Sequence, residues 1–110
     1  MRRLFPSLMC LFAASLAAVQ PAAAPEHALM TAMAQMNTAM ARVRMTGQPD
    51  RDFARMMIPH HVGAIAMAET ELHYGHDPVL LRLAQEIVVT QQQEIVVMRR
   101  ALAAHSHPRP

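Results

Sequence analysis

The sequence predicts an all-α protein, and three observations predict it. Apolar residues recur every three or four positions over residues 26–45, 50–74 and 78–105, which is the spacing of one helical face. Proline and glycine separate these segments, and no stretch shows the strict alternation of a strand. Both connections are short, so neighbouring helices should run in opposite directions. We therefore expect an antiparallel bundle of three helices in the mature chain.

The first helix is expected to begin and end at residues that commonly bound helices. Pro25 suits the first turn, because a helix start leaves its amide hydrogens unpaired, and Gly47 suits the C-terminal cap. Pro49 then forces a break between the first and the second helix. Asp50 or Asp52 is expected to cap the second helix, because a short carboxylate accepts hydrogen bonds from the first amides of a helix.

The third helix is expected to start with a similar signal. Gly75 ends the second helix, and Asp77 followed by Pro78 is a second aspartate-then-proline start. Val89 and Val96 fall on the otherwise polar side of this helix. They could be spare core surface or a contact for a second copy, so a homodimer is one expected assembly.

The first 24 residues have the layout of a secretory signal peptide. Arg2 and Arg3 precede an apolar run at 8–19 that is too short to span a bilayer comfortably, and small residues follow. We expect a leader at residues 1–24, with a cleavage point that the sequence leaves open. The alternative is an uncleaved N-terminal anchor. The helical metal-binding domain would then occupy 25–105, and residues 106–110 would form a tail.

Removing the leader changes the composition of the chain. Eight arginines then balance eight acidic residues, and there is no lysine. No basic stripe is visible, so neither nucleic acid nor, after cleavage, a membrane is an expected partner. Cys10, the single cysteine, lies in the leader, which leaves the mature chain without a disulfide. A domain of under ~90 residues with few aromatic side chains is near the lower limit for a stable core. A bound metal or self-association would stabilise it.

The centre of the second helix carries two adjacent histidines, His60 and His61, directly after Pro59. At about 100° per residue, His61 sits in the middle of the inward face, with Met57 one turn before it. His60 lies a quarter-turn away, in a stripe that includes Met67. An interior proline removes a helix hydrogen bond and bends or breaks the helix. We therefore expect Pro59 to mark a site and to turn both imidazoles toward a common point.

The third helix places Gln91 in its inward row, with Glu94 at the edge and Met98 one turn further. A buried amide without a partner costs about 1–3 kcal/mol, so Gln91 is expected to meet an imidazole. Gln91 or Glu94 would then orient the histidine ligands. On the first helix Met33 and Met40 share one side, and taken alone they are more readily explained as core packing.

Thioether sulfur and imidazole nitrogen together favour copper as a bound metal. The thioether is soft and selects Cu(I), while imidazole binds both Cu(I) and Cu(II), and Ag(I) is an expected mimic. Zinc and iron sites usually recruit cysteine or carboxylate, and the mature chain offers no thiol and few inward carboxylates. Methionine also cannot be lost to a disulfide in an oxidising compartment. The candidate ligands are His60, His61, Met57 and Met98, followed by Met67, Met33 and Met40.

These residues belong to a longer pattern, which reads Phe53, Met57-Ile58-Pro59-His60-His61, Ala64-Ile65, Met67-Ala68, Leu81-Arg82-Leu83-Ala84, Gln91, Glu94-Ile95 and Met98. Over roughly residues 50–100 the chain resembles the bacterial family called domain of unknown function 305 (DUF305), whose members are small, usually exported helical domains rich in His and Met. The resemblance implies a ferritin-like helical bundle and, from copper-handling members, copper binding for resistance or trafficking. Val62 and Ala66 stand where that family often has Gln and Asp, and these departures weaken an enzymatic interpretation.

The sequence therefore favours binding over catalysis, and no catalytic residue is predicted. We expect a periplasmic or secreted protein that buffers or carries copper, with a copper-trafficking protein as a partner. One alternative is a structural or adaptor bundle whose histidines only form hydrogen bonds. A ferritin-like metalloenzyme would need paired Glu-x-x-His motifs. Glu69 and His73 are four positions apart and lie away from the inward face, so they do not supply one.

Overall fold

A computed structural model describes residues 24–104 of the chain, and this part is entirely helical. It contains α1 (Ala24–Ala41), α2 (Pro49–Tyr74) and α3 (Pro78–Ala104), without any strand. The prediction of an all-helical fold with three helices is confirmed. Residues 1–23 of the predicted leader, His105 and the predicted tail lie outside the described residues, whereas Ala24 is the first residue of α1. No helix in the described part is long and apolar enough to cross a bilayer.

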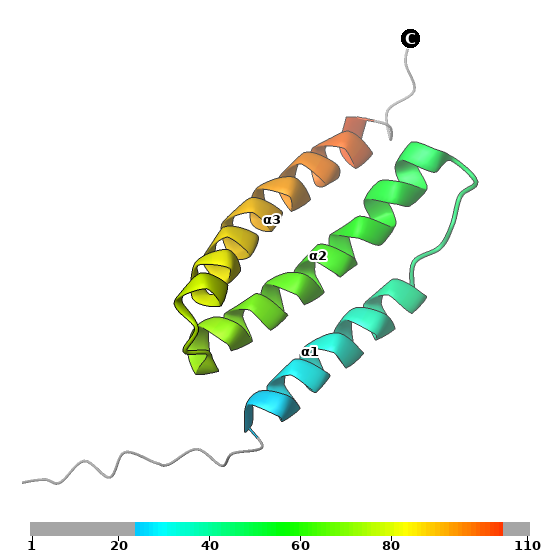
Figure 1. Ribbon diagram of the computed structural model, residues 1–110. Coiled ribbons are helices and arrows are strands. Elements are labelled where there is room, and N and C mark those ends of the chain that lie inside the picture. Colours follow the sequence, from blue (N-terminus) through cyan, green and yellow to red (C-terminus); the bar gives the residue numbers. More distant parts are fainter. Residues whose placement is uncertain (1–23, 105–110) are drawn as a thin grey trace, which may run out of the picture.

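The three helices form a single layer with α2 in the middle. α2 contacts both of its neighbours, whereas α1 and α3 do not contact each other, and Figure 1 shows the chain reversing direction at each connection. The expected bundle would instead bring all three helices together. The single layer follows from α2, which buries small residues on two opposite sides. Ala54 and Ala68 face α3, while Gly63 admits α1 on the other side.

α1 ends earlier than the sequence predicts, at Ala41 rather than near residue 45. Its last turn tightens, with the Arg42 amide bonding the Ala39 carbonyl at 3.3 Å and the Val43 amide bonding the Met40 carbonyl at 3.1 Å. Gly47 therefore does not cap this helix. It lies in the connecting loop, where its φ of 78° needs the left-handed freedom of glycine.

α2 begins at Pro49, and the predicted aspartate cap is wrong. The residue at the cap position is Gln48, which makes no side-chain cap bond. Asp52 turns back to the loop instead. Its carboxylate accepts the amide and the hydroxyl of Thr46, each at 2.7 Å, and the amide of Gly47 at 2.9 Å. These bonds, led by the Thr46 hydroxyl, hold the pKa of Asp52 below its usual value and fasten the loop to α2.

α3 begins as predicted. The Oδ1 atom of Asp77 accepts the amide of Val79 at 2.8 Å and that of Leu80 at 3.1 Å, with Pro78 in the first helical position. At the preceding turn, Gly75 donates its amide to the carbonyl of Glu71 at 2.7 Å and ends α2 where the sequence indicates. The short connection holds α3 alongside α2.

The layer has two broad faces, because α1 and α3 lie on opposite sides of α2. Residues spaced three or four apart line up along one side of a helix, so each face is made of one row from each helix. We define the methionine face by the rows 29–33–36–40 on α1, 53–57–60–64–67–71 on α2, and 80–83–87–94–97 on α3. The opposite face carries Val62 and Ala66 of α2, and Val89 and Val96 of α3.

Candidate metal site

The candidate site is built around His61, which lies at the centre of α2 and faces α3. Its side chain is buried, and its Nε2 atom is 2.7 Å from the Oε2 atom of Glu94 on α3. An ionised carboxylate can only accept a hydrogen bond, so Nε2 must carry the hydrogen and donate it. This bond fixes the orientation of the ring and links the middle of α2 to α3.

The second ring nitrogen of His61 is the notable atom of this site. Nδ1 is buried and has no hydrogen-bond partner among the described residues. In the neutral form of the ring, a bond donated by Nε2 to Glu94 leaves the lone pair at Nδ1. Metal-binding histidines show this same division, with one nitrogen held by a carboxylate and the other free to bind the ion. In this form of the ring, His61 could hold a metal through Nδ1.

Two thioethers lie next to this histidine. Met98 is buried against Ala54 and Ile95, and Met57, one turn before His61, packs against the same cluster. A cavity of about 380 Å³ opens beside them. It is lined by Phe53, Met57, His61, Glu94, Val97 and Met98. We call Met57, His61 and Met98 the inner group, and they combine one imidazole with two soft sulfur ligands.

Gln91 does not play the part that the sequence predicts for it. Its Oε1 atom is buried without a hydrogen-bond partner in residues 24–104, and the structure gives no bond between Gln91 and an imidazole. Glu94, one turn further along α3, makes the bond to His61 instead. Of the two residues expected to orient the histidines, Glu94 does so, and Gln91 contributes a polar atom that still lacks a partner.

His60 occupies a different environment from His61. It is exposed, and the centroids of the two rings are 6.1 Å apart with their planes inclined at 59°. α2 runs as one helix through Pro59, so the adjacent side chains keep their quarter-turn separation. The rings are neighbours, but one faces α3 and the other faces solvent. The expected convergence of both imidazoles on a single point is therefore not what this geometry provides.

The remaining candidate ligands group with His60 along the contact between α1 and α2. Met36 packs directly on Gly63, which sets the relative level of the two helices. The two helices run in opposite directions (Figure 1). Counting along each helix from the Met36–Gly63 contact then puts Met40 near the level of His60, and Met33 near the level of Met67. We call His60, Met67, Met33 and Met40 the outer group. α2 separates its α1 members from Met98.

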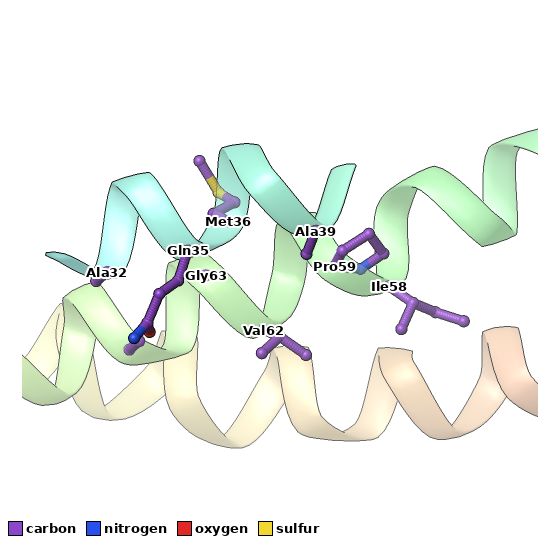
Figure 2. Close-up of a pocket in the computed structure, with 9 residues that line it drawn as sticks. Ala32, Gln35, Met36, Ala39, Ile58, Pro59, Val62 and Gly63 are labelled. Carbon is purple, nitrogen blue, oxygen red and sulfur yellow. The ribbon is translucent and has the colours of Figure 1, made fainter. Parts of the chain in front are cut away.

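A second hollow lies on the other side of this helix contact. It has a volume of about 350 Å³, and Figure 2 shows residues from both helices around it. Its lining is Ala32, Gln35, Met36, Ala39, Ile58, Pro59, Val62, Gly63 and Ala66. A Cβ atom on Gly63 would lie 2.5 Å from Cβ and Cγ of Met36, so only glycine permits this approach of α1. Pro59 thus faces the α1 contact and not the inner group.

Two residues of the inner cavity were not among the predicted site residues. Phe53 and Val97 line it beside His61 and Glu94. The spacing 53–57–61 on α2 and the spacing 94–97 on α3 are the signals that could have found them. No three His, Cys, Asp or Glu side chains in the described part of the chain come together as a metal-binding group. The inner group offers methionine sulfur beside its one imidazole.

Comparison with known proteins assigns the sequence to a family. The family described as a domain of unknown function (DUF305) matches residues 12–102, a stretch that begins inside the predicted leader. An uncharacterised protein of the Acanthamoeba polyphaga mimivirus is 38% identical over 53 residues, which is 48% of this chain and 35% of that protein. The chain thus spans about a third of the length of this relative. By the family match, this chain belongs to the DUF305 family.

Proposed function

We propose that the protein is an exported copper-binding protein that buffers copper, carries it, or confers resistance to it. The observation that carries the proposal is the buried Nδ1 atom of His61, which lacks a hydrogen-bond partner among residues 24–104. His61 lines one cavity together with Met57 and Met98. A lone pair held in this way costs free energy unless something binds it. A soft ion is the ligand that suits one imidazole and two thioethers.

The residues of the inner group fit Cu(I) better than a harder ion. Two neutral sulfurs and one neutral nitrogen give a soft set of ligands, and Ag(I) would bind the same set. Glu94 holds the ring through Nε2 and so leaves Nδ1 as the nitrogen available to an ion. Gln91 lies one turn before Glu94 on the same helix. In this proposal its buried Oε1 atom belongs to the polar groups around His61.

The outer group supplies a second, more accessible set of ligands. His60 is exposed, and Met33 is also exposed on the same face of the layer. An exposed imidazole with flexible thioethers suits rapid exchange of Cu(I), or capture of Cu(II) at the histidine. The proposal assigns retention of the ion to the inner group. It assigns transfer, to a copper-trafficking partner, to the outer group while the methionine face is uncovered.

Binding explains these residues better than catalysis does. The inner group contains no free carboxylate that could act as an acid or base, because Glu94 is engaged by His61. The proposal includes export of the protein and the ferritin-like arrangement that the family resemblance implies. The competing interpretation is an adaptor bundle in which the bond between His61 and Glu94 is purely structural. Its distinguishing feature is that no soft ion would bind at Nδ1.

The test is a titration of the purified chain with Cu(I) in the presence of a competing chelator. His61→Leu is expected to abolish the tightest site, and Met57→Leu or Met98→Leu to weaken it. Glu94→Gln should weaken it by about 10- to 100-fold, because the ring loses its fixed orientation. Met45→Leu is the matched control, since Met45 is exposed and lies outside both groups.

X-ray absorption of the copper-loaded chain provides the second measurement. Scattering from sulfur and from one imidazole is expected in the wild-type chain, and the imidazole contribution should disappear in His61→Leu. Circular dichroism confirms that each variant is helical before it is titrated. Unchanged affinity in both His61→Leu and the Met57→Leu, Met98→Leu pair would refute the inner site and leave the adaptor interpretation.

A further inference from the structure

We infer that the methionine face is an interface with a second copy of this chain. The rows that form it gather exposed large apolar side chains from all three helices. These are Leu29, Met33, Phe53, Leu80, Leu83 and Val97. An apolar surface that extends across three helices is unusual for a solvated monomer and marks an interaction site.

The single layer gives a physical reason for a second copy. Stable domains bury the apolar side of each helix between at least two layers of structure. Here the core is small: its buried apolar residues are Ala32, Ala54, Ala68, Ala84, Ile95 and Met98, and no large side chain in the described range is almost completely enclosed. Pairing two such layers through their apolar faces creates the missing core and leaves the other faces in water.

The charges of the two faces show which one is covered. Along the rows of the methionine face the charged residues are Glu71 and Glu94, and Glu94 is already paired with His61. The arginines of these helices, including Arg55 and Arg99, fall on the opposite face or on the outer edge. A surface without cations does not fit an anionic membrane, whereas it can pack against an identical, mostly neutral surface.

The size and shape of the face also fit a dimer. Helices of 18, 26 and 27 residues, at about 1.5 Å per residue and about 9 Å between axes, cover about 900 Å². A standard protein interface buries about 800 Å² on each partner. The face is also hollowed: the exposed side chains of Phe53 and Leu83 line hollows of about 380 and 310 Å³, respectively. A two-fold pairing would bury the same face on both copies and close the assembly.

The test compares two adjacent valines on α3 that belong to opposite faces. Val97 lies on the methionine face and is 64% exposed, whereas Val96 lies on the opposite face and is 44% exposed. The full chain, Val97→Arg and Val96→Arg are each studied by sedimentation equilibrium with a metal chelator present. The wild-type chain and Val96→Arg are expected to be dimers, and Val97→Arg should raise the dimer dissociation constant by about 30-fold or more.

A second measurement covers the case in which Val97→Arg fails to fold. Leu83→Ser removes apolar surface from the same face without adding a charge, and it should also weaken the dimer while circular dichroism stays helical. The unfolding midpoint of the wild-type chain should rise with protein concentration, as expected when only the folded state associates. A monomeric wild-type chain at 100 µM, roughly the concentration used for structural work, would overturn the inference. So would a dimer that Val96→Arg dissociates and Val97→Arg does not.

Discussion

His61 and Glu94 join the middle helix to the third helix through one hydrogen bond of 2.7 Å between Nε2 and Oε2. The histidine is buried, whereas about half of the glutamate side chain is exposed. The bond therefore lies at the boundary between the core and the methionine face. It fixes which nitrogen of the ring is available, and the proposed copper site depends on that choice.

Removing the Glu94 carboxylate is expected to destabilise the fold even without metal. Glu94→Ala leaves the buried Nε2 of His61 without an acceptor, which should lower the free energy of unfolding by about 1–2 kcal/mol. Glu94→Gln keeps an acceptor but loses the charge, so its cost should be about half as large. Urea unfolding followed by circular dichroism measures both. Glu86→Gln on the exposed side of α3 is the control, and an equal loss in that variant would contradict the prediction.

Adding a methyl group at Gly63 is expected to push α1 away from α2. The new Cβ would overlap Cβ and Cγ of Met36, which cannot move without the α1 backbone. Gly63→Ala gains about 1 kcal/mol of helix propensity but should lose about 1–3 kcal/mol to overpacking, so the net effect is destabilising by roughly 1 kcal/mol.

Hydrogen exchange locates the effect of that substitution. Amides of α1 should exchange faster in Gly63→Ala, while those of α3 keep their wild-type protection, because α1 contacts α2 alone. Gly47→Ala serves as the comparison. It strains a left-handed backbone position with open space around it, so it should lower stability without releasing α1 selectively. Unchanged α1 exchange in Gly63→Ala would show that this approach of the helices is not tight.

Asp52 should make the loop between α1 and α2 sensitive to acid. Hydrogen bonds from Thr46, and from the amide of Gly47, lower the pKa of this carboxyl in the folded state. A lowered folded pKa means that the contribution of Asp52 to stability is complete above the unfolded pKa of about 4 and is lost as the pH falls through the folded value. The stability difference between the wild-type chain and Asp52→Asn should therefore shrink below pH ~4. Unfolding in urea at several pH values measures it.

Two variants control that experiment. Thr46→Val removes the hydroxyl donor that contributes most to the lowered pKa of Asp52, and it should reduce the acid-dependent part of the stability difference. Asp50→Asn removes a negative charge from the same first turn of α2. A stability difference for Asp52→Asn that stays constant from neutral pH down to the acid range would disprove this role of the carboxylate.

Asp77 is expected to stabilise the start of α3 more than any other single side chain does. Its side chain bonds the amides of Val79 and Leu80, which otherwise have no acceptor in the first turn of α3. Asp77→Ala should lower the free energy of unfolding by about 1 kcal/mol, and Asp77→Ser should retain most of it. Chemical denaturation measures both variants. Equal stabilities for the alanine and serine variants would mean that the cap bonds contribute nothing.

Much of this protein can be predicted from local sequence alone. Proline, glycine and aspartate placed the α2–α3 connection correctly, because the residues that terminate and restart a helix act through their own backbone and nearest neighbours. The position of His61 on the inward side of its helix followed from the 100° turn of the backbone. The family also followed from a compact motif around Pro59.

Relations between separate helices were settled only by the tertiary structure. The sequence makes Gln91 and Glu94 equal candidates to meet a histidine, and the packing of α3 on α2 brings Glu94 to His61. Asp52 has the residue type of a cap, yet it bonds the loop because Thr46 and Gly47 fold back within its reach. The single layer likewise depends on Gly63 and on small residues on the opposite side of α2, and periodicity within one helix carries no information about which neighbour each side receives.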